Sequence, residues 1–131
     1  MEVKASTGLS KSYLPSRQIK KGEGILGSCL EKKRPLSVAD VGRDARTRDY
    51  KALRAENVAG ILTVPILQHN RAVGVIAVYT SKPHEFSQSE IDLLSTFASQ
   101  ASIAIENAQL YAEMKNQYMS MISALAAAIE A

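Results

Sequence analysis

The chain has 131 residues, of which 46% are hydrophobic, so it is long enough for one domain with an ordinary apolar core. It contains no run of 18 apolar residues and its first twenty residues are polar and basic, so we expect neither a membrane span nor a signal peptide. Its single cysteine, Cys29, excludes an intrachain disulfide and a cysteine-based metal cluster. Together these features predict a cytoplasmic location. This location is compatible with a membrane anchor upstream in a longer parent protein.

The charge is unevenly distributed, with 13 Lys and Arg against 7 Asp and Glu over residues 1–65, and 3 against 6 over residues 66–131. A basic half is one feature of nucleic-acid-binding proteins. Here no aromatic residue is interleaved with the basic runs Lys20-Lys21 and Lys32-Lys33-Arg34, and no nucleic-acid-binding motif is present. We therefore interpret the basic residues as solvated surface and expect no nucleic-acid partner.

The N-terminal part of the chain predicts short elements separated by glycine and proline. In chain order these are a strand over residues 2–6, a helical turn over 9–14, an extended stretch over 18–20, a helix over 23–32, a strand over 36–39, a polar loop over 40–47 and a helix over 50–57. One face of the helix over 23–32 is apolar and includes Cys29, which we therefore expect to be a buried small hydrophobic residue rather than a reactive thiol.

Two β-branched runs, residues 61–67 and 72–80, give the clearest strand signal, and the residues 69–71 between them predict a hairpin turn. Pro65 inside the first run indicates an edge position or a bulge. Gly74 in the second run indicates that another group packs closely there. The order of elements predicts an α+β domain with an antiparallel sheet, flanking helices and a long C-terminal helix.

The long helix is predicted from Phe86 to Glu130, because neither proline nor glycine occurs in this stretch. Ser87 and Glu90 have the spacing of a capping box, and Phe86 and Ile91 that of a hydrophobic staple. The helix would contain about 44 residues and be roughly 66 Å long. It therefore extends beyond what one small domain can cover.

Apolar residues of this helix follow the alternating 4-3 spacing of a coiled-coil seam, which predicts a homodimer through the C-terminal helix. The predicted seam consists of Phe97, Ala101, Ala104, Ala108, Tyr111, Tyr118, Ile122, Leu125 and Ile129, with Lys115 at one seam position. A second stripe beside it predicts the contact with the helix's own domain and consists of Leu94, Ala98, Ala101, Ile105, Ala108 and Ala112. The alternative is a single long core helix.

No set of residues in the sequence predicts catalysis or metal binding, so we expect no enzyme activity and no metal. His69 and His84 lie in a turn and a loop without ligand spacing, and no nucleotide-binding fingerprint or serine elbow is present. No cofactor is required by the sequence, and none is identified.

Irregular segments over residues 37–60 lie in sequence between two strands, and such segments can form a pocket over one face of a sheet. The polar candidates are Asp40, Arg43, Asp44, Arg46 and Tyr50. The alternative is that these carboxylates cap loops and pair with neighbouring arginines at the surface.

Together these segments resemble a GAF domain in order and spacing. The resemblance rests on Gly22-Glu23-Gly24-Ile25-Leu26-Gly27, Arg34-Pro35-Leu36-Ser37-Val38-Ala39-Asp40-Val41, Val64-Pro65-Ile66, Val73-Gly74-Val75-Ile76, and the helix from Phe86-Ser87 through Phe97-Ala98 and Ile103-Ala104-Ile105-Glu106-Asn107-Ala108 to Leu110-Tyr111. It implies a GAF sensory domain over residues 1–111, without the family's usual first helix and strand, followed by a signalling helix over 112–131.

The resemblance also implies a function, namely a regulatory module of a bacterial-type signalling protein that senses a small molecule and dimerises; the alternative is a dimerisation scaffold without a ligand. The ligand would lie between the sheet and the helix-and-loop layer, near Asp40, Arg43, Asp44, Tyr50, Leu53 and Val64. No membrane contact is expected within the chain. Residues 121–131 resemble the linker before HD-type phosphodiesterase domains, which implies such an output domain.

Three subgroups of the family carry residues that this chain lacks. Ser81, Glu90 and Ile91 stand where cyclic-nucleotide-binding members have Asn, Asp and Glu, so this ligand is not implied. Cys29 lies too early for a bilin-attaching cysteine, and one cysteine is fewer than the sulfoxide-reducing members use.

Overall fold

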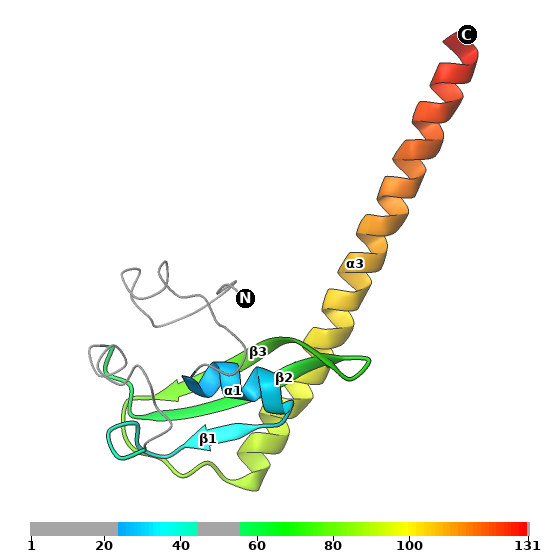
Figure 1. Ribbon diagram of the computed structural model, residues 1–131. Helices are drawn as coiled ribbons and strands as arrows, with labels where there is room; N and C mark the ends of the chain where they lie inside the picture. Colours follow the sequence, from blue (N-terminus) through cyan, green and yellow to red (C-terminus); the bar gives the residue numbers. More distant parts are fainter. Residues whose placement is uncertain (1–23, 45–55, 131) are drawn as a thin grey trace.

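The computed structural model describes residues 24–44 and 56–130 (Figure 1). Its elements are α1 (Gly24–Lys32), β1 (Leu36–Val38), β2 (Gly60–Gln68), β3 (Arg71–Thr80) and α3 (Gln88–Glu130). The three strands form an antiparallel sheet in the order β1-β2-β3. The predicted α+β class, with an antiparallel sheet, flanking helices and a long C-terminal helix, is confirmed.

Several predicted elements lie outside the described residues. These are the strand over 2–6, the helical turn over 9–14, the extended stretch over 18–20 and most of the helix over 50–57. The last two residues of that helix, Glu56 and Asn57, form a turn instead. Asn57 adopts a left-handed backbone with φ of 60°, which Asn tolerates better than most residues and which ends any helix there.

The hairpin between β2 and β3 turns over two residues, His69 and Asn70, both with positive φ (49° and 65°). This is the pattern of a type I′ turn, whose twist matches that of the flanking strands. The prediction of a turn over 69–71 was wrong by one residue, because Arg71 already pairs with Gln68.

The two faces of the sheet pack against different helices, since alternate side chains of a strand point to opposite faces. Figure 1 shows α1 on one face and α3 crossing the other. The core on the α1 face comprises Ile25, Leu26, Val38, Val41, Val58 and Ile61. The core on the α3 face comprises Val64, Ile66 and Ala98, with Ile76, Leu94, Ala101 and Ile105 packed against it. The predicted domain-facing stripe of the long helix is therefore confirmed over Leu94–Ile105.

Pro65 and Gly74 occupy the irregular part of the sheet, as predicted. Among the described pairs β1 reaches only to Thr63, so Pro65 lies past the end of β1. A bulge follows, because Ile66 pairs with Gly74 whereas Leu67 pairs with Ala72. The Ile66 side chain lies over Gly74, where an added Cβ would be 3.2 Å from Ile66 Cδ1.

The start of α3 is capped as predicted. The Ser87 backbone N–H donates to Glu90 Oε1 (2.9 Å), and the Glu90 N–H donates to Ser87 Oγ (3.2 Å). These reciprocal bonds complete the capping box and satisfy backbone donors that the first helical turn leaves without partners.

The helix is attached to the sheet for only part of its 43 residues, which correspond to roughly 64 Å. Its last contacts are with the hairpin: Ser102 Oγ donates to Leu67 O (2.6 Å), Gln68 Nε2 donates to Ser102 O (3.3 Å), and His69 Nε2 lies 3.3 Å from Glu106 Oε1. Every residue from 107 to 130 is exposed, and this part projects away from the sheet in Figure 1. Within the described residues, no helix combines the length and the hydropathy that a membrane span requires.

Candidate functional site

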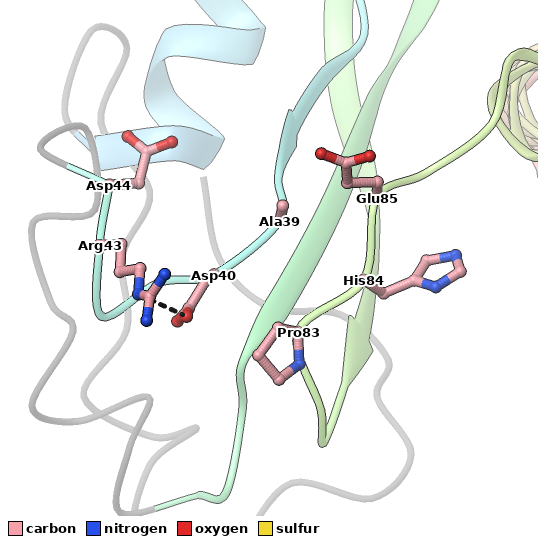
Figure 2. Close-up of a pocket in the computed structure, with 7 residues that line it drawn as sticks. All are labelled: Ala39, Asp40, Arg43, Asp44, Pro83, His84 and Glu85. Carbon is pink, nitrogen blue, oxygen red and sulfur yellow. Dashed lines mark ion pairs between the residues drawn. The ribbon is translucent and has the colours of Figure 1, made fainter.

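A cavity of about 560 Å³ lies where the loops that follow β1 and β3 meet. Its described lining consists of Ala39, Asp40, Arg43 and Asp44 after β1, and of Pro83, His84 and Glu85 after β3 (Figure 2). A second, adjoining cavity of about 390 Å³ also uses Asp40 and Arg43, and is bounded on its other side by residues 57–59 and Ser81. Cavities of these sizes are within the range that small-molecule sites occupy.

The loop after β1 is held in place by backbone and side-chain hydrogen bonds. The Val41 N–H donates to Ala59 O (2.7 Å), which fixes the loop to the residue that precedes β2. Asp40 Oδ1 accepts the Gly42 N–H (3.0 Å), as in an Asx turn. The carboxylate therefore has a structural role in the loop as well as a position in the cavity wall.

The charges around the cavity are mixed. Arg43 Nε lies 3.7 Å from Asp40 Oδ2, and the Arg43 side chain is 89% exposed. A pair with such exposure contributes little to stability, so the guanidinium can turn toward another anionic group at low cost. Asp44 after β1 and Glu85 after β3 add further carboxylates to the lining of the cavity.

The structure brings three of the six predicted ligand contacts together, namely Asp40, Arg43 and Asp44. Tyr50 and Leu53 lie outside the described residues. Val64 is placed elsewhere: it is fully buried in the core under α3, on the face of the sheet opposite to α1. Its prediction as a ligand contact is corrected for that reason, because strand alternation turns its side chain away from the cavity.

The second wall was not predicted from the sequence; it is formed by Pro83, His84 and Glu85. They are held at the cavity by the His84 N–H, which donates to Ala39 O (2.9 Å), and Gly60 lies next to this bond. A Cβ on Gly60 would be 3.5 Å from Ala39 O and 3.6 Å from His84 N, and it would collide with Thr80 Oγ1. Gly60 before a β-branched run was the available signal, since glycine in a strand often marks a close backbone approach.

Cys29 is a core residue, as predicted. It is fully buried, and its Sγ donates to Arg34 O (3.4 Å). Burial raises the pKa of the Cys29 thiol, and the neighbouring Thr63 hydroxyl opposes this effect. The thiolate is the reactive form, so the raised pKa makes Cys29 a poor nucleophile. Among the residues that the structure describes, no three His, Cys, Asp or Glu side chains form a potential metal site.

The large side chains of the predicted dimer seam are exposed. Phe97, Tyr111, Tyr118, Ile122, Leu125 and Ile129 are between 43% and 84% exposed. Ala101 is half-buried, because it also belongs to the stripe that packs on the sheet. The seam and the sheet-facing stripe therefore lie on neighbouring sides of α3, and contact with the sheet leaves the seam accessible.

Comparisons with known proteins agree with this architecture. The family model of the GAF domain matches residues 3–106. A domain assigned to a two-component sensor histidine kinase from Sinorhizobium meliloti superposes with a TM-score of 0.74 at 23% identity, covering 87% of this chain and 75% of that one. The GAF domain of a phosphoenolpyruvate-protein phosphotransferase from Coxiella burnetii gives 0.70 at 24% identity, covering 79% and 62%.

A GAF domain from Synechocystis sp. PCC6803, solved in its photoproduct state, gives a TM-score of 0.60 at 29% identity and covers 67% of this chain and 57% of that one. The chain thus spans less than two thirds of the length of most of these structures. No curated protein matches it significantly. From the family match and the shared fold, the chain belongs to the GAF domain family and is a regulatory signalling domain.

Proposed function

We propose that this GAF domain senses a small molecule, dimerises through α3 and relays its state along that helix to an output domain. The observation that carries the proposal is the apolar seam, which continues beyond the hairpin contact at Glu106 to Ile129 with its large side chains exposed. A two-stranded coiled coil would cover these side chains by placing them at a and d positions.

Burial of the seam supplies the reason for pairing. Covering a large apolar side chain stabilises by about 1.5–3 kcal/mol, and each copy of α3 presents five such residues beyond Glu106. A helix without tertiary contacts is marginal in water, so the partner also stabilises the helical state. Lys115 at a core position weakens the pairing locally and gives the seam a point where two packings can be close in energy.

Sedimentation velocity tests the dimer with a matched pair of double variants. Ile122→Asp with Leu125→Asp places charges in the seam, whereas Ser120→Asp with Ser123→Asp adds the same charge to the same turns outside it. We expect the first variant to be monomeric and the second to sediment like the wild type. A seam variant with unchanged dimer content would refute the coiled coil.

Sensing is supported by the cavity between the loops after β1 and β3 and by similarity to domains of a sensor kinase and a photoreceptor. A ligand that binds the folded state raises the unfolding temperature by mass action. We expect a purine nucleotide, a tetrapyrrole or an amino acid to raise the melting temperature of the wild type, and the rise to be smaller in Arg43→Ala.

The alternative function is a scaffold that dimerises and binds nothing. It predicts a sedimenting dimer together with a flat thermal-shift panel. Native mass spectrometry of protein purified from cells would then show only the mass of two chains, without a bound small molecule. The HD-type output domain implied by residues 121–131 stays a prediction.

A further inference from the structure

We propose that the segment Pro83–Ser87 couples the cavity to the start of α3, with His84 as the connecting residue. The use of this coupling in signalling rests on the proposed function. The connection itself consists of contacts on two sides of one residue, its backbone on the cavity side and its imidazole on the helix side.

The backbone of His84 is bonded to the opposite wall of the cavity. Its N–H donates to Ala39 O (2.9 Å), and Ala39 directly precedes Asp40, whose carboxylate holds the loop after β1. Gly60 lies beside this bond, where an added Cβ would be in van der Waals contact with both Ala39 O (3.5 Å) and His84 N (3.6 Å). A ligand that separates the walls must therefore move His84 or break this bond.

The imidazole of His84 points away from Asp40 and Arg43 (Figure 2). Its Nε2 lies 2.9 Å and 3.0 Å from the two carboxylate oxygens of Glu90, and its ring meets Phe86 edge-to-face at 4.8 Å. The same Glu90 carboxylate accepts the Ser87 N–H of the capping box. His84 thus holds the group that fixes the first turn of α3.

The connection is short enough to transmit a displacement. Only Glu85 and Phe86 separate His84 from the capping residue Ser87, so a shift of His84 is absorbed by the cap or passed to the helix. The hairpin holds α3 again at Ser102, about 18 Å along the helix from Glu90. Ile129 lies about 40 Å beyond Ser102, so a tilt about that attachment is roughly doubled at the end of the seam.

Amide hydrogen exchange by NMR tests the coupling without a ligand. The reporters are the His84 N–H, bonded to Ala39, and the Gly42 N–H, bonded to Asp40. In Glu90→Gln and in His84→Ala we expect exchange at both amides to accelerate on the order of 5- to 10-fold, relative to the intrinsic rates of each sequence, because local opening becomes easier.

Asp92→Asn is the matched control, because it weakens the hydrogen bond from Gln88 (2.9 Å) in the same helical turn without touching His84. It should leave both reporter amides unchanged. Exchange that rises only within α3 in Glu90→Gln, or that rises equally in Asp92→Asn, would overturn the coupling. This experiment requires neither a ligand nor dimerisation. A negative result would therefore not refute sensing or dimerisation, and a negative result in the tests of sensing or dimerisation would not affect the coupling.

Discussion

The two parts of α3 both carry an apolar stripe, but their surroundings are opposite. From Gln88 to Glu106 the helix is capped, packed on the sheet and bonded to the hairpin. From 107 to 130 every residue is exposed, although apolar residues continue at the same spacing. An apolar stripe therefore indicates that one side of a helix is a packing surface. The geometry of the rest of the chain decides whether the same chain covers that surface.

The attached part has its small side chains where the helix backbone is buried against the sheet, with Leu94 and Ile105 on either side of them. Ala98 and Ala101 face the sheet, where a small residue lets the helix backbone approach the strands. The exposed part instead presents Tyr118, Ile122 and Leu125, which are large enough to act as knobs in a coiled coil. Three predictions sharpen the contrast between the two parts.

The largest effect is expected from a charge in the attached part. Ala98 is 3% exposed between Val64 and Ile66, so Ala98→Asp buries a carboxylate without a partner. We expect a loss on the order of 4 kcal/mol in the free energy of unfolding, measured by urea denaturation. Ala127→Asp makes the same change in the exposed part and should cost less than about 0.5 kcal/mol. Equal losses would show that the two parts are not energetically distinct.

A smaller effect is expected where the helix leaves the sheet. Ser102→Ala removes the hydroxyl that donates to Leu67 O, which should lower the free energy of unfolding by about 1 kcal/mol. Ser99→Ala is the control, because the Ser99 hydroxyl donates only to Ser95 O in its own helix. The melting temperature of Ser102→Ala should therefore be lower than that of Ser99→Ala. The reverse order would contradict the conclusion that the hairpin holds α3.

The smallest effect concerns the cap and depends on pH. The hydrogen bond from the Ser87 backbone, followed by that from His84, lowers the pKa of Glu90. The ionised cap therefore contributes its full stability above the ordinary glutamate pKa of about 4.3, and this contribution is lost as the pH falls through the lower pKa of the folded state. The difference in melting temperature between wild type and Glu90→Gln should shrink in that acidic range; a constant difference would contradict the role of the charge.

Within residues 24–44 and 56–130, local patterns in the sequence predicted most of the fold. The capping box, the long helix and the β-hairpin were identified because each depends on residues close in sequence. The bounds of the hairpin turn were wrong by one residue because the register is set by pairing, here of Arg71 with Gln68, rather than by turn composition.

The candidate site was predicted only on the side that lies in one sequence segment. Asp40, Arg43 and Asp44 share a loop, whereas Pro83, His84 and Glu85 reach the cavity through a contact with Ala39, more than forty positions away in sequence. Val64 was misplaced because both faces of β2 are buried, so its hydrophobic pattern does not reveal which face turns toward the loops.

The bonds between Ser102 and the hairpin have a consequence for any domain that follows this one. They fix the place where α3 leaves the sheet and also the rotation of α3 about its own axis. Each later residue therefore points in a defined direction around the helix axis. One inserted residue would rotate everything downstream by about 100°, whereas seven restore the bearing to within roughly 20°. The number of residues in the linker thereby sets the rotational orientation of a following domain. Fusions to this domain should therefore differ in linker length by multiples of seven residues.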